Sequence, residues 1–189
     1  MKGIIFILSI LMSTSAVAQY DNGYIILYSG DTVRGNIKVG MTELSSYQQV
    51  KFEKDGKTTK YTPDQVRGYQ LNHLRFVTKE IGKKYQTKVF FLIHTRGYCT
   101  LYESMVNHGM TSDGFGNPSM RVTRTYYLER EGEELHPVNF PLLKQGRDLY
   151  FLDNPSLTYD IKTGKYKKAQ LVDIVKRYNQ ERKEAEAQK

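Results

Sequence analysis

The one cysteine and four histidines of this chain are the residues best suited to nucleophilic or metal chemistry. Cys99 follows His94 across a turn signal at Gly97, so folding could bring the thiol beside an imidazole base. Cys99 also shares a predicted strand face with Leu101, which is the pattern of a small buried hydrophobic residue. We therefore expect a buried thiol and assign no catalytic residue.

The four histidines match no zinc-binding spacing and lie in separate segments, at His73, His94, His108 and His136. Residues 113–117 supply one carboxylate and one amide, which are fewer oxygen ligands than calcium takes. The chain has no P-loop, dinucleotide-binding fingerprint or G-x-S-x-G motif. We assign no metal-binding or cofactor-binding residue. A carboxylate pair of the glycosidase type stays open, because folding can bring any two acids together.

Residues 107–120 are the best candidate for a partner-binding segment. They are rich in Gly, Asn, Ser and Asp and lie between two predicted strands, so we expect an irregular loop. Long irregular loops are uncommon in compact domains and are often either functional or disordered. His108, Phe115 and Asn117 would supply the contacts to a partner. A loop that is merely disordered is the alternative.

The elements that would position these residues read as short strands followed by helices. Asp55-Gly56, Asn72-His73 and Arg96-Gly97 mark tight turns between β-prone stretches. Residues 89–93 are apolar without alternation, which predicts a central strand covered on both faces. The chain is therefore expected to form one α+β domain. Its predominantly antiparallel sheet of about eight or nine strands would curl into a roll or barrel-like form, since closure protects the edges.

The hydrophobic period changes from that of strands to that of helices after residue 140. Asn154-Pro155 predicts a capped helix start. A final amphipathic helix is predicted by the stripe Leu171, Ile174, Val175 and Tyr178. The predicted organisation is a signal segment (1–18), an antiparallel β domain (19–140), a helical segment packed on the sheet (141–180) and a charged tail (181–189).

The N-terminus has the three parts of an export signal: Lys2, an apolar stretch over 3–12, and the small-residue site Ala16-Val17-Ala18. The apolar run of about ten residues is shorter than the roughly 20 that span a bilayer, so we expect cleavage after Ala18 rather than a membrane anchor. No later apolar run suggests a transmembrane span. The protein would then act in the periplasm, or associated with the outer membrane or cell surface.

The formal net charge of +8 is spread along the chain rather than gathered in one block. Such a charge favours weak attraction to polyanions, which for an exported protein are envelope polysaccharides or lipid headgroups rather than nucleic acid. A single cysteine permits no intramolecular disulfide, so packing alone must hold the fold.

Three passages carry a resemblance to a known family: 23–26 (GYII) with 30–35 (GDTVRG), 61–69 (YTPDQVRGY), and 153–157 (DNPSL) with Tyr166 and Tyr178-Asn179. The chain resembles a family of uncharacterised exported proteins of Gram-negative bacteria with a GYI…GDT…G start and a DCP.L…YN helical end. The resemblance implies export and a strands-then-helices order, and it implies no activity. Asn154 stands where that family has Cys, so no role of that thiol is carried over.

These observations favour a non-enzymatic, envelope-associated binding or interaction module for an unknown envelope component or protein partner, without a cofactor. An envelope hydrolase that acts on glycan or peptide through residues not identifiable from spacing is the alternative. A purely structural partner in an envelope assembly is a third hypothesis, and it predicts an exposed apolar patch.

Overall fold

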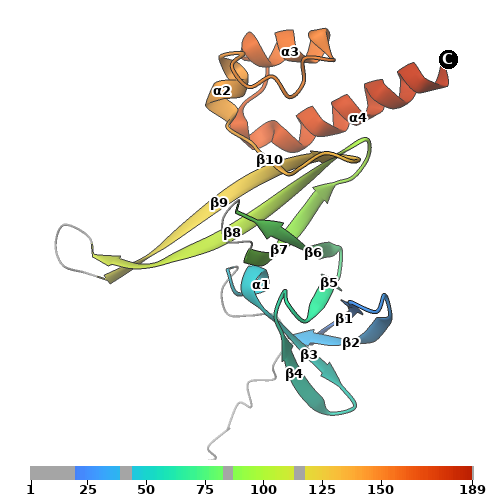
Figure 1. Ribbon diagram of the computed structural model, residues 1–189, viewed down its shortest axis with the longest axis vertical. Helices are drawn as coiled ribbons and strands as arrows, with labels where there is room; N and C mark the ends of the chain where they lie inside the picture. Colours follow the sequence, from blue (N-terminus) through green and yellow to red (C-terminus); the bar gives the residue numbers. More distant parts are fainter. Residues whose placement is uncertain (1–19, 39–43, 83–86, 113–117, 189) are drawn as a thin grey trace, which may run out of the picture.

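The computed structural model describes residues 20–38, 44–82, 87–112 and 118–188 (Figure 1). The predicted signal segment 1–18 and its cleavage site after Ala18 lie outside the described residues. The strands are β1 (Tyr20–Leu27), β2 (Thr32–Lys38), β3 (Val50–Lys54), β4 (Lys57–Tyr61), β5 (Val66–Leu71), β6 (Leu74–Ile81), β7 (Thr87–Thr95), β8 (Cys99–Ser112), β9 (Pro118–Arg130) and β10 (His136–Pro137). The helices are α1 (Ser45–Gln48), α2 (Phe140–Lys144), α3 (Pro155–Lys162), the 3-10 turn η1 (Lys168–Gln170) and α4 (Leu171–Ala187).

The strands form one antiparallel sheet in the order β10-β9-β8-β7-β6-β5-β1-β2-β3-β4, and three α-helices follow it in the chain. The predicted α+β class and the strands-then-helices order are confirmed. The sheet has ten strands and is not closed, because β4 and β10 lie at its opposite ends. Closure is not needed to protect these edges: β10 has two residues, and β4 carries the exposed lysines Lys57 and Lys60.

The turns follow the local chemistry of their residues. Asp55 and Gly56 both have positive φ, 51° and 74°, as a two-residue hairpin turn requires. Asn72 likewise has φ 52° between β5 and β6. The central strand is also confirmed, because Phe90 and Phe91 point to opposite faces of β7 and are both fully buried.

The predicted irregular loop over 107–120 is wrong for the residues that the structure describes. β8 runs to Ser112 and β9 begins at Pro118, with Met110 opposite Met120 across a register shift that follows Asn107. Beyond Glu103, β8 pairs with β9 alone, and Figure 1 shows this ribbon projecting from the sheet. The polar composition of this segment led to the prediction of a loop, but backbone pairing between β8 and β9 makes the segment a ribbon.

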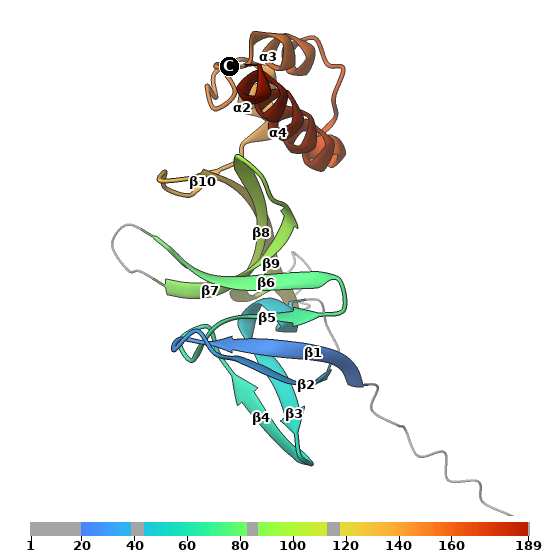
Figure 2. The ribbon, with the colours of Figure 1, turned by 90° about the vertical axis from the view of Figure 1, so that its right-hand side faces the viewer.

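The hydrophobic core is divided into two clusters. One lies among β1 to β7 and α1, and the other packs β8 and β9 against the C-terminal helices. The predicted stripe of α4 is buried in the second cluster, at Leu171, Ile174, Val175 and Tyr178. The C-terminal helices α2, α3 and α4 therefore cover only one end of the sheet (Figures 1 and 2). α4 continues to Ala187, so most of the charged tail is the exposed end of this helix.

Candidate binding groove

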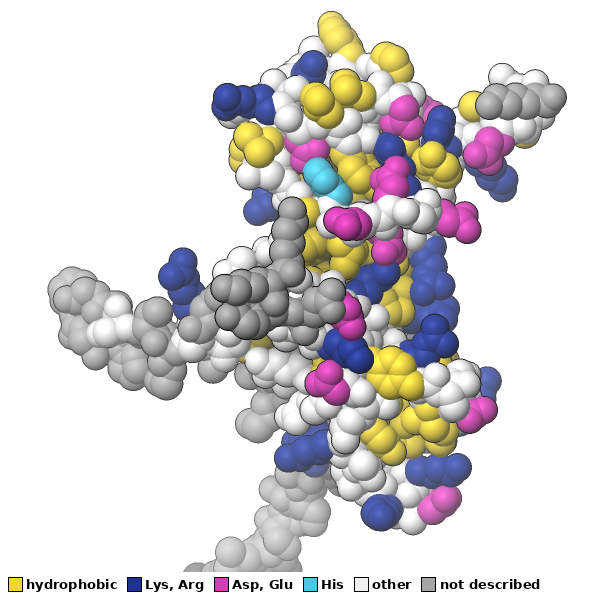
Figure 3. Space-filling view, in the orientation of Figure 1, with side chains coloured by type: hydrophobic (Ala, Val, Ile, Leu, Met, Phe, Trp, Pro, Cys, Tyr) yellow, Lys and Arg dark blue, Asp and Glu magenta, His cyan; other side chains and the backbone are white. Residues whose placement is uncertain are grey.

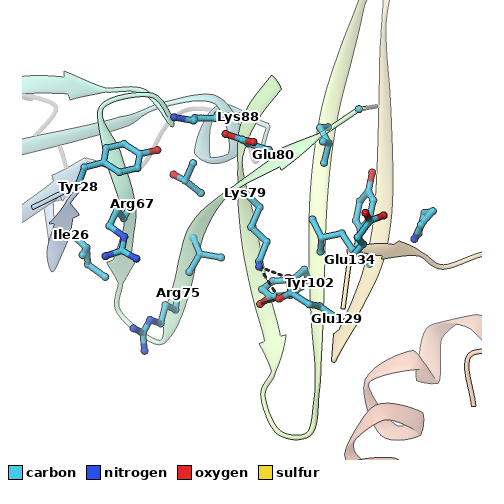
Figure 4. Close-up of a pocket in the computed structure, with 17 residues that line it drawn as sticks. Ile26, Tyr28, Arg67, Arg75, Lys79, Glu80, Lys88, Tyr102, Glu129 and Glu134 are labelled. Carbon is cyan, nitrogen blue, oxygen red and sulfur yellow. Dashed lines mark hydrogen bonds and ion pairs between the residues drawn. The ribbon is translucent and has the colours of Figure 1, made fainter. Parts of the chain in front are cut away.

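A groove of about 1390 Å³ lies on the sheet, between the β1–β5–β6 side and the turn that leads from β9 to β10 (Figure 4). Its walls come from seven strands that are far apart in the sequence. The side chains that the argument uses are Tyr28, Arg67, Arg75, Lys79, Glu80, Lys88, Tyr102, Tyr127, Glu129 and Glu134. We call this hollow the sheet groove.

An ion pair occupies the middle of the sheet groove. Lys79 Nζ lies 2.8 and 2.7 Å from the two carboxylate oxygens of Glu129, and the Tyr102 hydroxyl donates to Glu129 Oε2 at 2.8 Å. The Lys79 ammonium also lies 4.7 Å from the centroid of the Tyr102 ring. Burial and the adjacent Glu129 carboxylate raise the pKa of Tyr102, so its hydroxyl remains a donor. Glu129 is therefore a neutralised structural acid rather than a free base.

Aromatic rings pack beside the ion pair of Lys79 and Glu129. The buried Phe91 ring packs edge-to-face against Tyr102 and Tyr127, with ring centroids 6.1 and 5.2 Å apart. Burial also raises the pKa of Tyr127. Such packing fixes the groove floor before any ligand arrives.

The β5–β6–β7 wall carries three further cations: Arg67, Arg75 and Lys88. Among the described residues, none of them forms an ion pair with a carboxylate. Lys88 instead lies over the half-exposed Tyr28 ring, 5.0 Å from its centroid. The Nε of Arg75 is buried and has no hydrogen-bond partner in the described structure. The charges of these three cations are therefore not balanced by ion pairs within the described structure.

The sheet groove is mixed in charge rather than uniformly basic. Glu80 and Glu134 also line it, and Glu80 stands opposite Lys88 in the β6–β7 register. Figure 4 places Glu134 and Glu129 on the side opposite Arg67 and Arg75. The β5–β6–β7 wall thus carries cations together with Glu80, and the opposite side carries the acceptors Glu129 and Glu134.

Three residues, His108, Phe115 and Asn117, are predicted to form a partner-binding loop. His108 lies in β8, and Phe115 and Asn117 lie outside the described residues, so their partner-binding role stays a prediction. The sequence did not predict the groove residues, because the walls of the groove are formed by strands that only folding brings together. The available signal was the alternation of Arg75 and Lys79 with apolar residues along one face of β6.

Cys99 is fully buried, whereas a nucleophilic cysteine must be accessible to its substrate. Its Sγ lies 3.7 Å from the Tyr150 hydroxyl, while the nearby His94 bonds Glu103 at 2.9 Å. Burial raises the pKa of the Cys99 thiol to about 11. Little thiolate therefore exists at neutral pH.

The native protein should accordingly react with a thiol reagent such as dithionitrobenzoate at least about a hundredfold more slowly than the unfolded chain, since both burial and the raised pKa suppress attack. The time course is followed by absorbance with and without denaturant. Rapid labelling of the native protein would contradict a buried, protonated Cys99.

Comparisons with protein-family models, with curated proteins and with solved structures found no match. Within the described ranges, no group of three His, Cys, Asp or Glu side chains gathers as a metal site. In the same part of the chain, no helix is both long and apolar enough to cross a membrane. The function is therefore inferred from the chemistry of the sheet groove.

Proposed function

We propose that the protein is a non-enzymatic, exported and envelope-associated binding module, and that its sheet groove binds an anionic polysaccharide. The observation that carries the proposal is the wall of Arg67, Arg75 and Lys88, whose charges no described carboxylate neutralises.

An acidic glycan fits both walls of the groove. Its carboxylates would pair with guanidinium groups, which bind planar oxyanions through two parallel hydrogen bonds. Its hydroxyls would donate to Glu80 and Glu134, and its rings would pack on Tyr28. An open groove also admits a chain that continues past both ends.

Binding is better supported than hydrolysis. The best-placed acid, Glu129, is held by Lys79 and Tyr102, and a general acid or base must be free to exchange a proton. The buried Cys99 does not support a thiol mechanism. Export is supported by the N-terminal pattern that ends in Ala16-Val17-Ala18, and attraction to a polyanion by the net charge of +8.

The test is binding to polygalacturonate, with neutral dextran as the uncharged polymer. Replacing Arg67, Arg75 and Lys88 together by Ala should weaken binding to polygalacturonate by about tenfold to a hundredfold, because each exposed charge pair contributes about 0.5–1 kcal/mol. Isothermal titration calorimetry at low salt measures the change.

The matched control replaces Lys54, Lys57 and Lys60 of the β3–β4 hairpin by Ala, which removes the same charge from exposed positions outside the groove. This variant should lose less than about threefold in affinity. An equal loss of affinity in the two triple variants would mean that polygalacturonate is held by general electrostatic attraction, and it would refute binding in the groove.

A further inference from the structure

Exposed hydrophobic side chains gather at the helical end of the molecule. Of the six large hydrophobic residues that the described chain exposes, four belong to the α2–α3 region: Leu142, Leu149, Leu152 and Tyr159. Leu149, Leu152 and Tyr159 are 57%, 51% and 68% exposed. We call these four residues the apical patch. Figure 3 shows hydrophobic side chains spread over this end.

The α2–α3 region and the turn before α4 also carry exposed basic side chains. Five exposed basic side chains of this region form no ion pair with a described carboxylate: Lys144, Arg147, Lys162, Lys167 and Lys168. The acids of the region pair with other basic side chains: Asp148 with His136, Asp153 with Arg130 and Arg182, and Asp160 with Arg177 and Lys165. The region that carries the apical patch therefore has an excess of positive charge.

The ends of α2 and α3 bring two of these cations together. The Lys162 side chain lies against Gly146, just after α2, and Lys144 Nζ lies 3.7 Å from where a Cβ of Gly164 would stand. The two helix C-termini are thus neighbours, although they are separated by a long connection in the chain. Lys144 and Lys162 therefore lie close to the ends of the two helices that carry Leu142 and Tyr159.

The α2–α3 region, which carries the apical patch, lies at one end of the longest axis of the molecule, beyond the sheet (Figures 1 and 2). A planar surface could meet this end without touching the ribbon of β8 and β9 or the sheet groove. No residue of the patch lines the groove. The two surfaces can therefore be occupied at the same time.

We propose that the apical patch docks on an anionic lipid bilayer, with its leucines among the acyl chains and its lysines at the headgroups. Apolar insertion and attraction of basic side chains to anionic lipid are the two terms that hold peripheral proteins on membranes. The basic side chains of this region outnumber its carboxylates, and this excess positive charge is complementary to an anionic surface. Docking in this way would hold the groove away from the bilayer.

The test is co-sedimentation with sucrose-loaded vesicles of phosphatidylcholine and phosphatidylglycerol, and with vesicles of phosphatidylcholine alone. The protein should sediment with the anionic vesicles and far less with the neutral ones. Leu149→Ser with Leu152→Ser should lower the partition coefficient by about tenfold, and so should Lys144→Gln with Lys162→Gln. All variants share one N-terminus, so residues 1–18 contribute equally to each.

Two controls separate this proposal from groove binding. Lys57→Gln with Lys60→Gln removes equal charge far from the patch and should keep vesicle binding within about threefold. The Arg67, Arg75 and Lys88 triple variant should keep vesicle binding while losing polygalacturonate, and the double-leucine variant should do the reverse. Unchanged sedimentation of the double-leucine variant, equal binding to neutral vesicles, or no vesicle binding by the unaltered protein would overturn membrane docking.

Discussion

Asn179→Ala is expected to lower the free energy of unfolding by about 2–4 kcal/mol, because it leaves two backbone groups unpaired at a buried junction. The Asn179 side chain donates from Nδ2 to the Cys99 carbonyl at 2.8 Å and accepts at Oδ1 from the Cys99 amide at 2.7 Å. Pairing of β7 with β8 begins only at Leu101, so the amide of α4 takes the place of a neighbouring strand.

Urea denaturation followed by circular dichroism measures this loss. Gln180→Ala is the matched control, because Gln180 is the next residue of the same helix, is exposed, and donates from its side chain to Glu184 of that helix. The control should change the stability by less than about 0.5 kcal/mol. A similar stability for the two variants would show that the Asn179 contact contributes nothing.

Gly97→Ala tests the contact between Asn179 and the start of β8 independently. A Cβ at Gly97 would lie 2.5 Å from both Cγ and Nδ2 of Asn179, so the methyl group must displace the amide. The destabilisation by Gly97→Ala should therefore shrink when Asn179 is already Ala. A double-mutant cycle that gave additive effects would contradict this coupling.

Glu103→Gln is expected to destabilise the protein by about 3 kcal/mol at neutral pH, since it removes a buried charge on which three elements converge. Glu103 is 3% exposed, accepts from the Tyr47 hydroxyl at 2.6 Å, bonds His94 at 2.9 Å and lies 3.4 Å from Arg124 Nε. These partners come from α1, β7 and β9, so the carboxylate ties the short helix to the sheet.

The loss should depend on pH. Burial by itself raises the pKa of Glu103, but hydrogen bonds from His94 and Tyr47 and the charge of Arg124 outweigh it and hold the pKa below its ordinary value. A carboxyl with a lowered pKa stabilises the fold above its unfolded pKa of about 4.3, and this contribution disappears as the pH falls through the folded value.

The stability gap between the protein and Glu103→Gln should therefore be largest at about pH 7 and should narrow towards about pH 3. Guanidinium denaturation at both pH values measures it. Glu131→Gln, in the exposed turn after β9, is the control and should alter stability little at either pH. A gap that stays constant with pH would mean that the charge of Glu103 does not stabilise the fold.

Features encoded within a few residues were predictable from the sequence. Asp55-Gly56 and Asn72 form the expected turns, because short polar residues and glycine tolerate positive φ. Asn154 accepts from the Leu157 amide at 3.0 Å as a helix cap, with Pro155 in the first helical position. The stripe of α4 is buried because its period matches one helix face. The export signal stays a prediction, since it lies outside the described residues.

Features that join distant residues depended on tertiary structure. The Tyr178-Asn179 pair stood out in the sequence, but only folding places Asn179 beside Cys99, 80 positions away. Lys79 and Glu129 meet across 50 positions, and strand pairing turns the polar segment after Asn107 into a ribbon. Local patterns reflect the conformational preferences of neighbouring residues, whereas the sheet groove, the helix junction and the apical patch depend on which strands and helices pack together.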